Sequence, residues 1–283
     1  MLKHFFAYIQ YLLPQHLISR SAGMLANSKN PSIKNTFIKK FIQLYKIDMA
    51  EAVIENPDNY ANFNDFFIRY LKPELRMIDQ APQMIVCPAD GKIAEAGNIN
   101  KQLLLQAKGQ YFDLTGLLGG DQALAKHFEN GQFATVYLAP NNYHRVHMPI
   151  SGELIKTIYI PGKLFSVNRM TSDLIPQLYS RNERFVAIFE TAIGPVAIIL
   201  VGAMIVGSMQ TVWMKEPIRG NQIISETPGD RIVLEKGAEL GHFKLGSTVI
   251  MLFGKDQMKW LPAVQTDVSV KFGQALGEIL SLS

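Results

Sequence analysis

The 283-residue sequence contains one cysteine, Cys87, and comparatively few charged residues, 18% of the total. A single cysteine excludes an internal disulfide framework and any metal site built from several thiolates. Hydrophobic residues make up 48% of the chain, which is enough for a sizeable core in one large domain or two smaller ones. The low charge favours a protein that contacts lipid or one with a large β core.

Acidic residues are almost absent from the first fifty positions, which hold seven lysines and arginines but only Asp48 as an acid. The rest of the chain is slightly acidic, so the net charge of +4 originates in this segment. Aromatic and aliphatic residues accompany the basic ones there. We therefore expect an anionic membrane surface, and not nucleic acid, as the partner.

The basic segment has two stretches with apolar residues at helical spacing. The first is residues 2–13, ended by Pro14; the second begins at Asn30-Pro31, a cap followed by proline in the first turn. The first stretch is too short and polar to cross a bilayer and is not followed by a secretory cleavage site. Each helix could pack on its own domain, but two such helices in succession favour binding at a membrane interface.

From about Met84 the pattern changes to short β-like runs separated by Gly, Pro and Asn. A helix is expected between residues 114 and 130. Residues 191–213 carry no charge, as a spanning helix would, but glycines interrupt them at strand-length intervals, which favours two buried strands. The predicted strands are 84–87, 92–96, 133–138, 153–160, 185–190, 196–201, 206–213, 248–253 and 268–272.

The fold predicted from these patterns is α+β. Residues 1–75 form an N-terminal helical segment that associates with the membrane. Residues 76–283 form a β-rich body, a mainly antiparallel β-sheet or sandwich, and would be the catalytic domain if the chain is an enzyme.

Two short stretches could carry acid–base chemistry, although each also has an ordinary explanation. Asp90-Gly91 lies between two β-like runs and is typical of a hairpin turn. His144 and His147 lie within four residues at the end of a predicted strand, where acid–base residues are often found; the alternative is loop histidines bonded to backbone. No third ligand of suitable spacing accompanies them, so no metal site is predicted.

A third stretch, Gly246-Ser247, directly precedes Thr248 and the apolar run 249–253. Glycine tolerates a strained backbone, and the Ser247 hydroxyl lies within reach of the Gly246 carbonyl. With a base nearby, the hydroxyl could attack that carbonyl and convert the amide into an ester, and β-elimination would then cut the chain. By itself, Gly-Ser-Thr is also a commonplace turn.

Taken together, these stretches resemble the phosphatidylserine decarboxylase family, specifically its bacterial membrane-associated members. The departures from the family pattern are mild and include residues 214–217. The matching motifs occur in family order over almost the whole chain and include Phe63-Asn64-Asp65-Phe66-Phe67 with Arg69, Leu71 and Arg76, Pro88-Ala89-Asp90-Gly91, Tyr143 to Pro149, Pro161-Gly162 with Leu164 to Asn168, and Phe243 to Thr248.

The resemblance implies that Asp90, His147 and Ser247 form a triad in which His147 is the base for Ser247 and Asp90 orients the imidazole. Cleavage between Gly246 and Ser247 would leave a large chain, 1–246, and a small chain, 247–283. Ser247 would become a pyruvoyl group, a covalent cofactor that forms a Schiff base with phosphatidylserine. That group would accept electrons as carbon dioxide leaves, so that phosphatidylethanolamine is the product.

Further roles follow from the same resemblance. His144 would serve the decarboxylation step, and Phe165, Ser166 and Val167 would line the substrate. The protein would be a homodimer of the cleaved pair, bound peripherally to the cytoplasmic face of a bacterial cell membrane. Two alternatives stay open: a serine hydrolase that uses the triad without cutting itself, and a non-catalytic membrane-binding module with an inert Gly-Ser turn.

Overall fold

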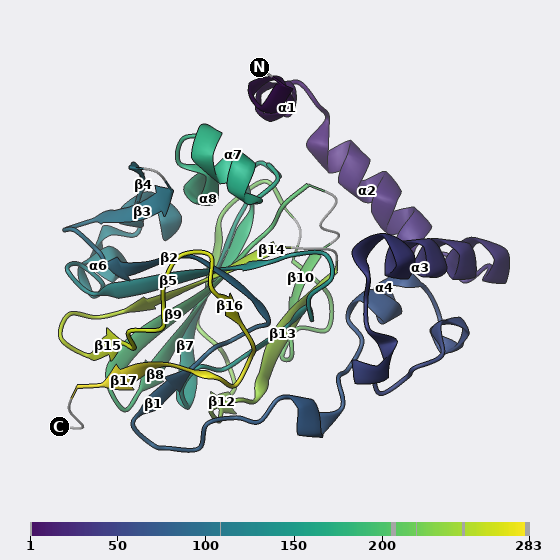
Figure 1. The fold of residues 1–283 in the computed structure, drawn as a ribbon. Coiled ribbons are helices and arrows are strands. Elements are labelled where there is room, and N and C mark those ends of the chain that lie inside the picture. The colour runs from purple at the N-terminus through teal and green to yellow at the C-terminus, as the bar shows by residue number, and fades with distance from the viewer. Residues whose placement is uncertain (1, 108, 205–207, 219, 245–246, 281–283) are drawn as a thin grey trace.

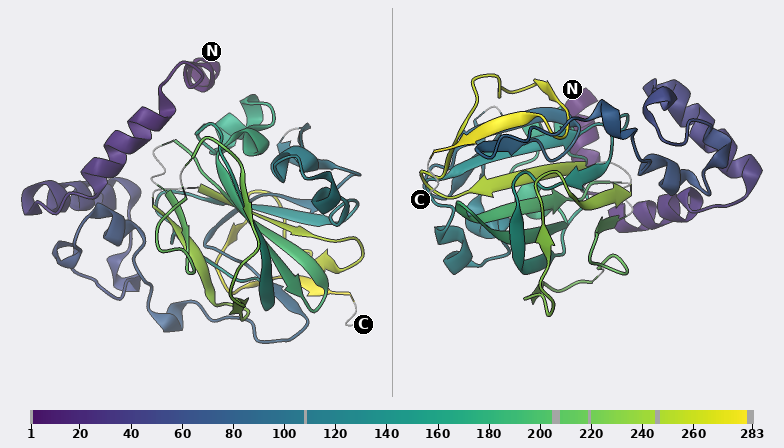
Figure 2. Two further views of the ribbon diagram at one scale, coloured as in Figure 1. Left: turned by 180° about the vertical axis from the view of Figure 1, so that it is seen from behind. Right: turned by 90° about the horizontal axis from the view of Figure 1, so that it is seen from below.

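The structure is a computed structural model that describes residues 2–107, 109–204, 208–218, 220–244 and 247–280. Helices come first and a mostly antiparallel β body follows, which confirms the predicted α+β class (Figure 1). The helical segment lies to one side of the β body in all three ribbon views (Figure 2). Its helices are α1 (Leu2–Ile9), α2 (Gln15–Ala26), α3 (Pro31–Tyr45) and α4 (Phe63–Phe67), with 3₁₀ turns at Met49–Glu51, Pro57–Asn59 and Pro73–Leu75.

The local sequence explains the limits of these helices. The Asn30 side chain accepts a hydrogen bond from the Ser32 amide at 3.0 Å, so it caps α3 as predicted. Helix α1 ends earlier than residue 13, and α2 begins directly after Pro14, which occupies its N-cap. Helix α2 was not predicted, because polar residues interrupt its apolar positions.

The largest sheet is antiparallel throughout and forms the centre of the β body. Strand β12 (Val233–Leu234) pairs with one of its outer strands, β7. The strand order is β11 (Ile224–Glu226), β7 (Gly152–Ile160), β8 (Arg184–Thr191), β9 (Gly194–Val201), β14 (Ser247–Phe253), β5 (Gln132–Leu138), β2 (Gly91–Asn98) and β16 (Ser269–Val270).

Both faces of this sheet are covered. One face packs against two three-stranded sheets, β1 (Met84–Val86) with β17 (Ala275–Ile279) and β15 (Met258–Trp260), and β10 (Ser208–Thr211) with β13 (Glu239–Lys244) and β6 (Arg145–His147). The other face packs against the β3 (Leu103–Ala107) and β4 (Gln110–Asp113) hairpin and four short helices, α5 (Leu114–Leu117), α6 (Gln122–Lys126), α7 (Arg169–Leu174) and α8 (Leu178–Arg181).

Residues 191–213 carry no charge because the strand β9 within them is buried on both faces of the sheet. In β9, Ile198 and Leu200 belong to one core and Ile199 and Val201 to the other, so this strand has no solvent-facing side. The run forms β9 and β10, as predicted. None of the helices in the described ranges combines the length and apolarity that a membrane span requires. The helix expected between residues 114 and 130 is two short helices, α5 and α6, separated by Gly119 and Gly120.

Residues 68–71 join the helical segment to the β body. Leu71 forms a β-bridge with Ala52, and the Ile68 carbonyl accepts a 2.8 Å hydrogen bond from Nε of Arg145 on β6. The Arg145 guanidinium also lies 3.5 Å from the centre of the Tyr70 ring. The aromatic helix α4 is therefore fixed beside the strand that carries His147.

Candidate functional site

The backbone brings the predicted site residues onto adjoining segments. Ser247 is the first residue of β14 and pairs with Leu138, the last residue of β5. The loop after Leu138 leads to His144 and then to β6, which contains His147. On the other side, the Phe243 amide donates to the His144 carbonyl at 3.0 Å, four residues before Ser247. Gly246 lies outside the described residues, so the cleavage site itself stays a prediction.

His144 is fully buried beneath the aromatic helix. Its ring lies 4.0 Å from the ring of Phe67, and its Nδ1 donates to the Asn142 carbonyl at 2.8 Å. Its Nε2 has no hydrogen-bond partner within the described ranges. Burial, together with the nearby Arg69 charge, lowers the His144 pKa to about 3. At neutral pH this side chain is thus an uncharged imidazole whose free lone pair is held in a dry site.

His147 is also buried, and burial lowers its pKa below the ordinary histidine value. Its Nδ1 donates to the Gly237 carbonyl at 2.9 Å, so the lone pair of the neutral ring lies on Nε2. The Tyr143 hydroxyl lies 3.3 Å from that Nε2. The Phe272 ring stacks on the imidazole at 3.9 Å and 9°. These contacts fix both the tautomer and the plane of a candidate base.

Asp90 lies in the same region but has another partner. Its carboxylate receives three hydrogen bonds from Arg76 at 2.6 to 3.0 Å and one from the Phe272 amide at 2.9 Å. No hydrogen bond joins the Asp90 carboxylate to the His147 ring among the described residues. Their connection runs through Phe272, whose amide binds Asp90 and whose ring stacks on His147. The triad therefore stays a prediction.

The segment expected to line the substrate is held by the N-terminal helices. The Leu164 amide donates to Oε1 of Gln15 at 2.7 Å, and the Ser166 amide donates to Oε1 of Gln10 at 2.9 Å. Phe165 is fully buried, and its ring centre lies 4.8 Å from that of Tyr11. Val167 is also buried. The substrate-lining role of residues 165–167 stays a prediction, but their backbone is coupled to the first two helices.

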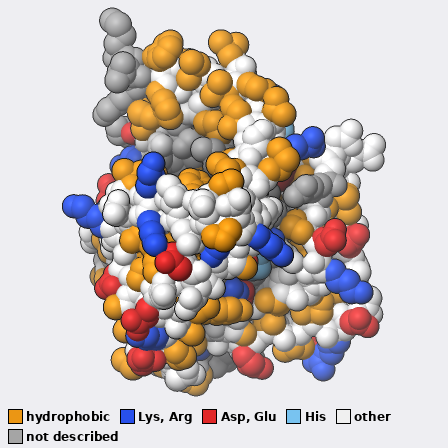
Figure 3. Space-filling view, turned by 90° about the vertical axis from the view of Figure 1, so that its right-hand side faces the viewer, with side chains coloured by type: hydrophobic (Ala, Val, Ile, Leu, Met, Phe, Trp, Pro, Cys, Tyr) orange, Lys and Arg blue, Asp and Glu red, His pale blue; other side chains and the backbone are white. Residues whose placement is uncertain are grey.

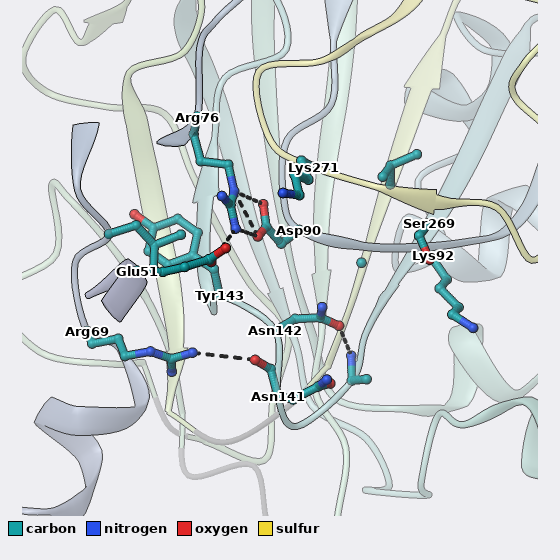
Figure 4. A pocket seen from close by; sticks show the side chains of 14 residues that line it. Glu51, Arg69, Arg76, Asp90, Lys92, Asn141, Asn142, Tyr143, Ser269 and Lys271 are labelled. Carbon is teal, nitrogen blue, oxygen red and sulfur yellow. Dashed lines mark hydrogen bonds and ion pairs between the residues drawn. The ribbon is translucent and has the colours of Figure 1, made fainter. Parts of the chain in front are cut away.

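A cavity of about 280 Å³ opens beside the two histidine segments (Figure 4). Several of its residues had no predicted role, because only the fold brings residues 51, 69, 76, 141 and 271 together. Arg69 and Arg76 are basic residues near an aromatic run, which only weakly indicates a functional site. No sequence pattern indicates a role for Phe272. No cluster of three or more metal-ligating side chains occurs in the described ranges. The cavity is lined by Glu51, Arg69, Leu71, Arg76, Asp90, Gly91, Lys92, Ala139, Asn141, Asn142, Tyr143, Ser269, Val270 and Lys271.

Known proteins are similar to this sequence over nearly its whole length. A family model described as phosphatidylserine decarboxylase matches residues 63–278, and a second model, described as PSD, matches residues 5–46. The phosphatidylserine decarboxylase proenzyme of Bordetella avium is 48% identical, over 94% of this chain and 92% of that relative. That of Azotobacter vinelandii is 48% identical, over 95% and 96%, and that of Pseudomonas putida (strain GB-1) is 47% identical, over 98% and 99%. The chain therefore belongs to the phosphatidylserine decarboxylase family.

Proposed function

We propose that this chain converts phosphatidylserine into phosphatidylethanolamine and carbon dioxide after cutting itself between Gly246 and Ser247. The observation that supports the proposal is a pair of buried neutral imidazoles, His144 and His147. His144 lies in the loop between β5, the strand that pairs with Ser247, and β6, and His147 lies on β6. Its relatives' names, phosphatidylserine decarboxylase proenzyme, specify the same substrate and a precursor form.

His147 is the base for self-cleavage. Its Nε2 lone pair takes the Ser247 hydroxyl proton, and Oγ attacks the Gly246 carbonyl, so that the amide becomes an ester. Loss of the Ser247 α-proton then expels the Gly246 carboxylate and leaves a dehydroalanine. Tautomerisation to an imine and addition of water release ammonia and leave a pyruvoyl group. Asp90, anchored by Arg76, contributes a fixed negative charge near the imidazolium that forms transiently.

His144 Nε2, on the segment that follows the strand paired with Ser247, has no hydrogen-bond partner within the described residues, so it is available to a pyruvoyl group formed at Ser247. The ketone of that group supplies the electron sink for decarboxylation. His144 is not protonated at neutral pH, because its pKa is lowered to about 3, so it cannot act directly as a general acid. It first accepts a proton, which the substrate ammonium can provide, and then returns it to the carbon that has lost carbon dioxide.

The first two helices attach the protein to an anionic membrane, and we place it peripherally on the cytoplasmic face of a bacterial cell membrane. Hydrophobic side chains gather over the end of the molecule where α1 and α2 lie (Figure 3). Leu12 and Met24 are 85% and 72% exposed there. Burying such side chains at an interface contributes roughly 25 cal/mol per Å² of apolar surface. Lys39 already pairs with Asp58, so this lysine is not free to contact lipid headgroups.

Substituting the two exposed residues tests this attachment. Leu12→Ser with Met24→Ser should reduce co-sedimentation with anionic vesicles and leave self-cleavage intact. Val233→Ser on β12, at the opposite end of the molecule, is the matched control. Equal vesicle binding by all three proteins would contradict the interfacial role. The cleaved pair is also expected to form a homodimer, which light scattering can check.

Intact mass and release of labelled carbon dioxide test the proposed reaction. The wild type should consist of two fragments that meet at 246/247, with a blocked pyruvoyl terminus on the smaller one. Ser247→Ala should stay uncut and release no carbon dioxide, whereas His144→Gln should be cut but inactive. Decarboxylation by uncut Ser247→Ala would refute the mechanism. A single intact chain that hydrolyses an ester would identify a serine hydrolase instead.

A further inference from the structure

Arg69 differs from the other buried arginines of the structure. Arg184 is 3% exposed and donates to the carbonyls of Leu117, Gly116 and Asn182. Arg76 is 8% exposed and binds two carboxylates. Arg69 is 5% exposed, yet its Nε and Nη1 have no partner among the described residues, and its Nη2 reaches the Asn141 carbonyl only at 3.4 Å.

This arrangement is unfavourable for the unliganded protein. Burial lowers the Arg69 pKa because desolvation penalises the guanidinium cation. A buried charge is normally paired, and unmade hydrogen bonds of a charged group are costly. A side chain kept in this state is poised for a partner that arrives from outside the chain.

The charges around Arg69 specify an anion. Arg69 lines the 280 Å³ cavity together with two exposed lysines, Lys92 and Lys271. The cavity's two carboxylates, Glu51 and Asp90, both form ion pairs with Arg76, and neither forms one with Arg69 among the described residues. The cavity thus carries an excess of positive charge. Figure 4 shows the Arg69 guanidinium directed across the cavity towards Asn141, away from the Arg76–Asp90 pair.

The cavity also lies next to the reaction centre. Its wall includes Ala139, one residue after the Leu138 that pairs with Ser247, and one strand residue spans about 3.3 Å. Its wall further includes Asn142, which holds His144, and Tyr143, which contacts His147. An anion bound to Arg69 is therefore close to both imidazoles.

We propose that Arg69 binds the phosphodiester of the lipid headgroup and so positions the substrate, an inference that rests on the proposed function. A guanidinium offers parallel donors that match two phosphate oxygens. The substrate's other anion, its carboxylate, is lost in the reaction, and a strong cation on it would oppose its departure. The phosphodiester persists from substrate to product, so binding it contributes equally throughout the reaction and affects mainly KM.

Arg69→Gln tests the proposal with a soluble short-chain phosphatidylserine, so that membrane binding does not enter. Loss of charge-assisted hydrogen bonds should raise KM roughly tenfold or more, with kcat within about twofold and complete self-cleavage. The variant should also unfold at the same or a higher temperature, because it removes a buried unpaired charge. Arg231→Gln, which alters an exposed arginine paired with Glu153, should change neither KM nor the unfolding temperature.

Thermal shift with headgroup fragments distinguishes the anions. Glycerophosphoethanolamine should stabilise the wild type but not Arg69→Gln, whereas free serine should act equally on both. Unchanged KM and unchanged fragment binding would overturn the proposal. If Arg69→Gln loses stabilisation by free serine, Arg69 binds the carboxylate and the proposal is refuted. If inorganic phosphate stabilises the wild type but Arg69→Gln leaves KM unchanged, the cavity binds free phosphate and the proposal is also refuted. If the wild type releases no carbon dioxide, the proposed function fails, but fragment binding still tests Arg69.

Discussion

Substitution of Phe272 tests most directly how the candidate base, His147, is oriented. Its ring stacks on the His147 imidazole at 3.9 Å and 9°, while its backbone amide binds Asp90. Replacing Phe272 with Leu keeps the amide and much of the apolar volume but removes the aromatic stack. The substitution therefore isolates the orientation of His147 from the position of Asp90.

The magnitude follows from the stacking energy. Aromatic pairs contribute about 0.5–1.5 kcal/mol beyond the burial of their surface. If that energy holds the imidazole plane during attack by Ser247, its loss slows self-cleavage by roughly two- to tenfold. The Gly237 carbonyl still fixes the tautomer, so we expect a slower reaction and not a complete loss.

A time course after synthesis in a cell-free system, followed by denaturing gel, measures the cleavage rate directly. Phe128→Leu is the matched control, because Phe128 is a fully buried ring in the core on the other face of the sheet. It should lower stability while leaving the cleavage rate near that of the wild type. Folded Phe272→Leu that cleaves as fast as the wild type would refute the view that this ring orients the base.

Three further predictions concern buried or capping residues. The His144 pKa is about 3 in the folded protein and about 6.5 when unfolded, so acidification protonates the unfolded chain first. Protonation of this residue therefore lowers the free energy of unfolding by about 2 kcal/mol between pH 7 and pH 5. In His144→Gln the urea midpoint should change less over this pH range than in the wild type. Burial raises the pKa of the Cys87 thiol to about 12, so iodoacetamide should label it only after denaturation, and rapid native labelling seen by mass spectrometry would contradict its burial. Asn30→Ala should lower the free energy of unfolding by about 1 kcal/mol in urea titrations through loss of the α3 cap, while Asn30→Gly should cost less.

Local patterns were sufficient for the elements that depend on local chemistry. The cap at Asn30 and the apolar central strands follow from residue type and spacing, whereas the first helix ends at Ile9, earlier than Pro14 alone would require. Strands β6 and β13 were not predicted, because their polar and charged residues hide the alternation that marks a strand. The histidine segment, expected to be a loop, consequently contains a short strand that fixes His147.

The candidate site depends on contacts that no local pattern encodes. Asp90 was predicted to orient His147, and no local pattern indicated that its carboxylate also binds Arg76, which comes from a different segment of the chain. Phe272 approaches His147 only after the C-terminal strands have folded back against β1 and β2. That two guanidinium nitrogens of Arg69 lack hydrogen-bond partners among the described residues is seen only in the folded structure. Residue types therefore indicated the candidate catalytic groups, whereas the tertiary structure determines which side chains contact them.

The backbone amides of Ser166 and Leu164 donate hydrogen bonds to Gln10 and Gln15, so the N-terminal segment that we propose to bind the membrane also supports the interior. Deleting residues 1–27 to obtain a soluble enzyme would leave two backbone amides of the 164–166 segment without acceptors, at about 1–3 kcal/mol each if they stay buried. Activity lost by such a shortened protein would mix poor lipid attachment with a loosened interior segment. Conversely, if the first two helices bind the bilayer as proposed, a force on them is transmitted to that segment through Gln10, Gln15 and the Tyr11–Phe165 ring contact, so lipid contact and the interior are mechanically linked.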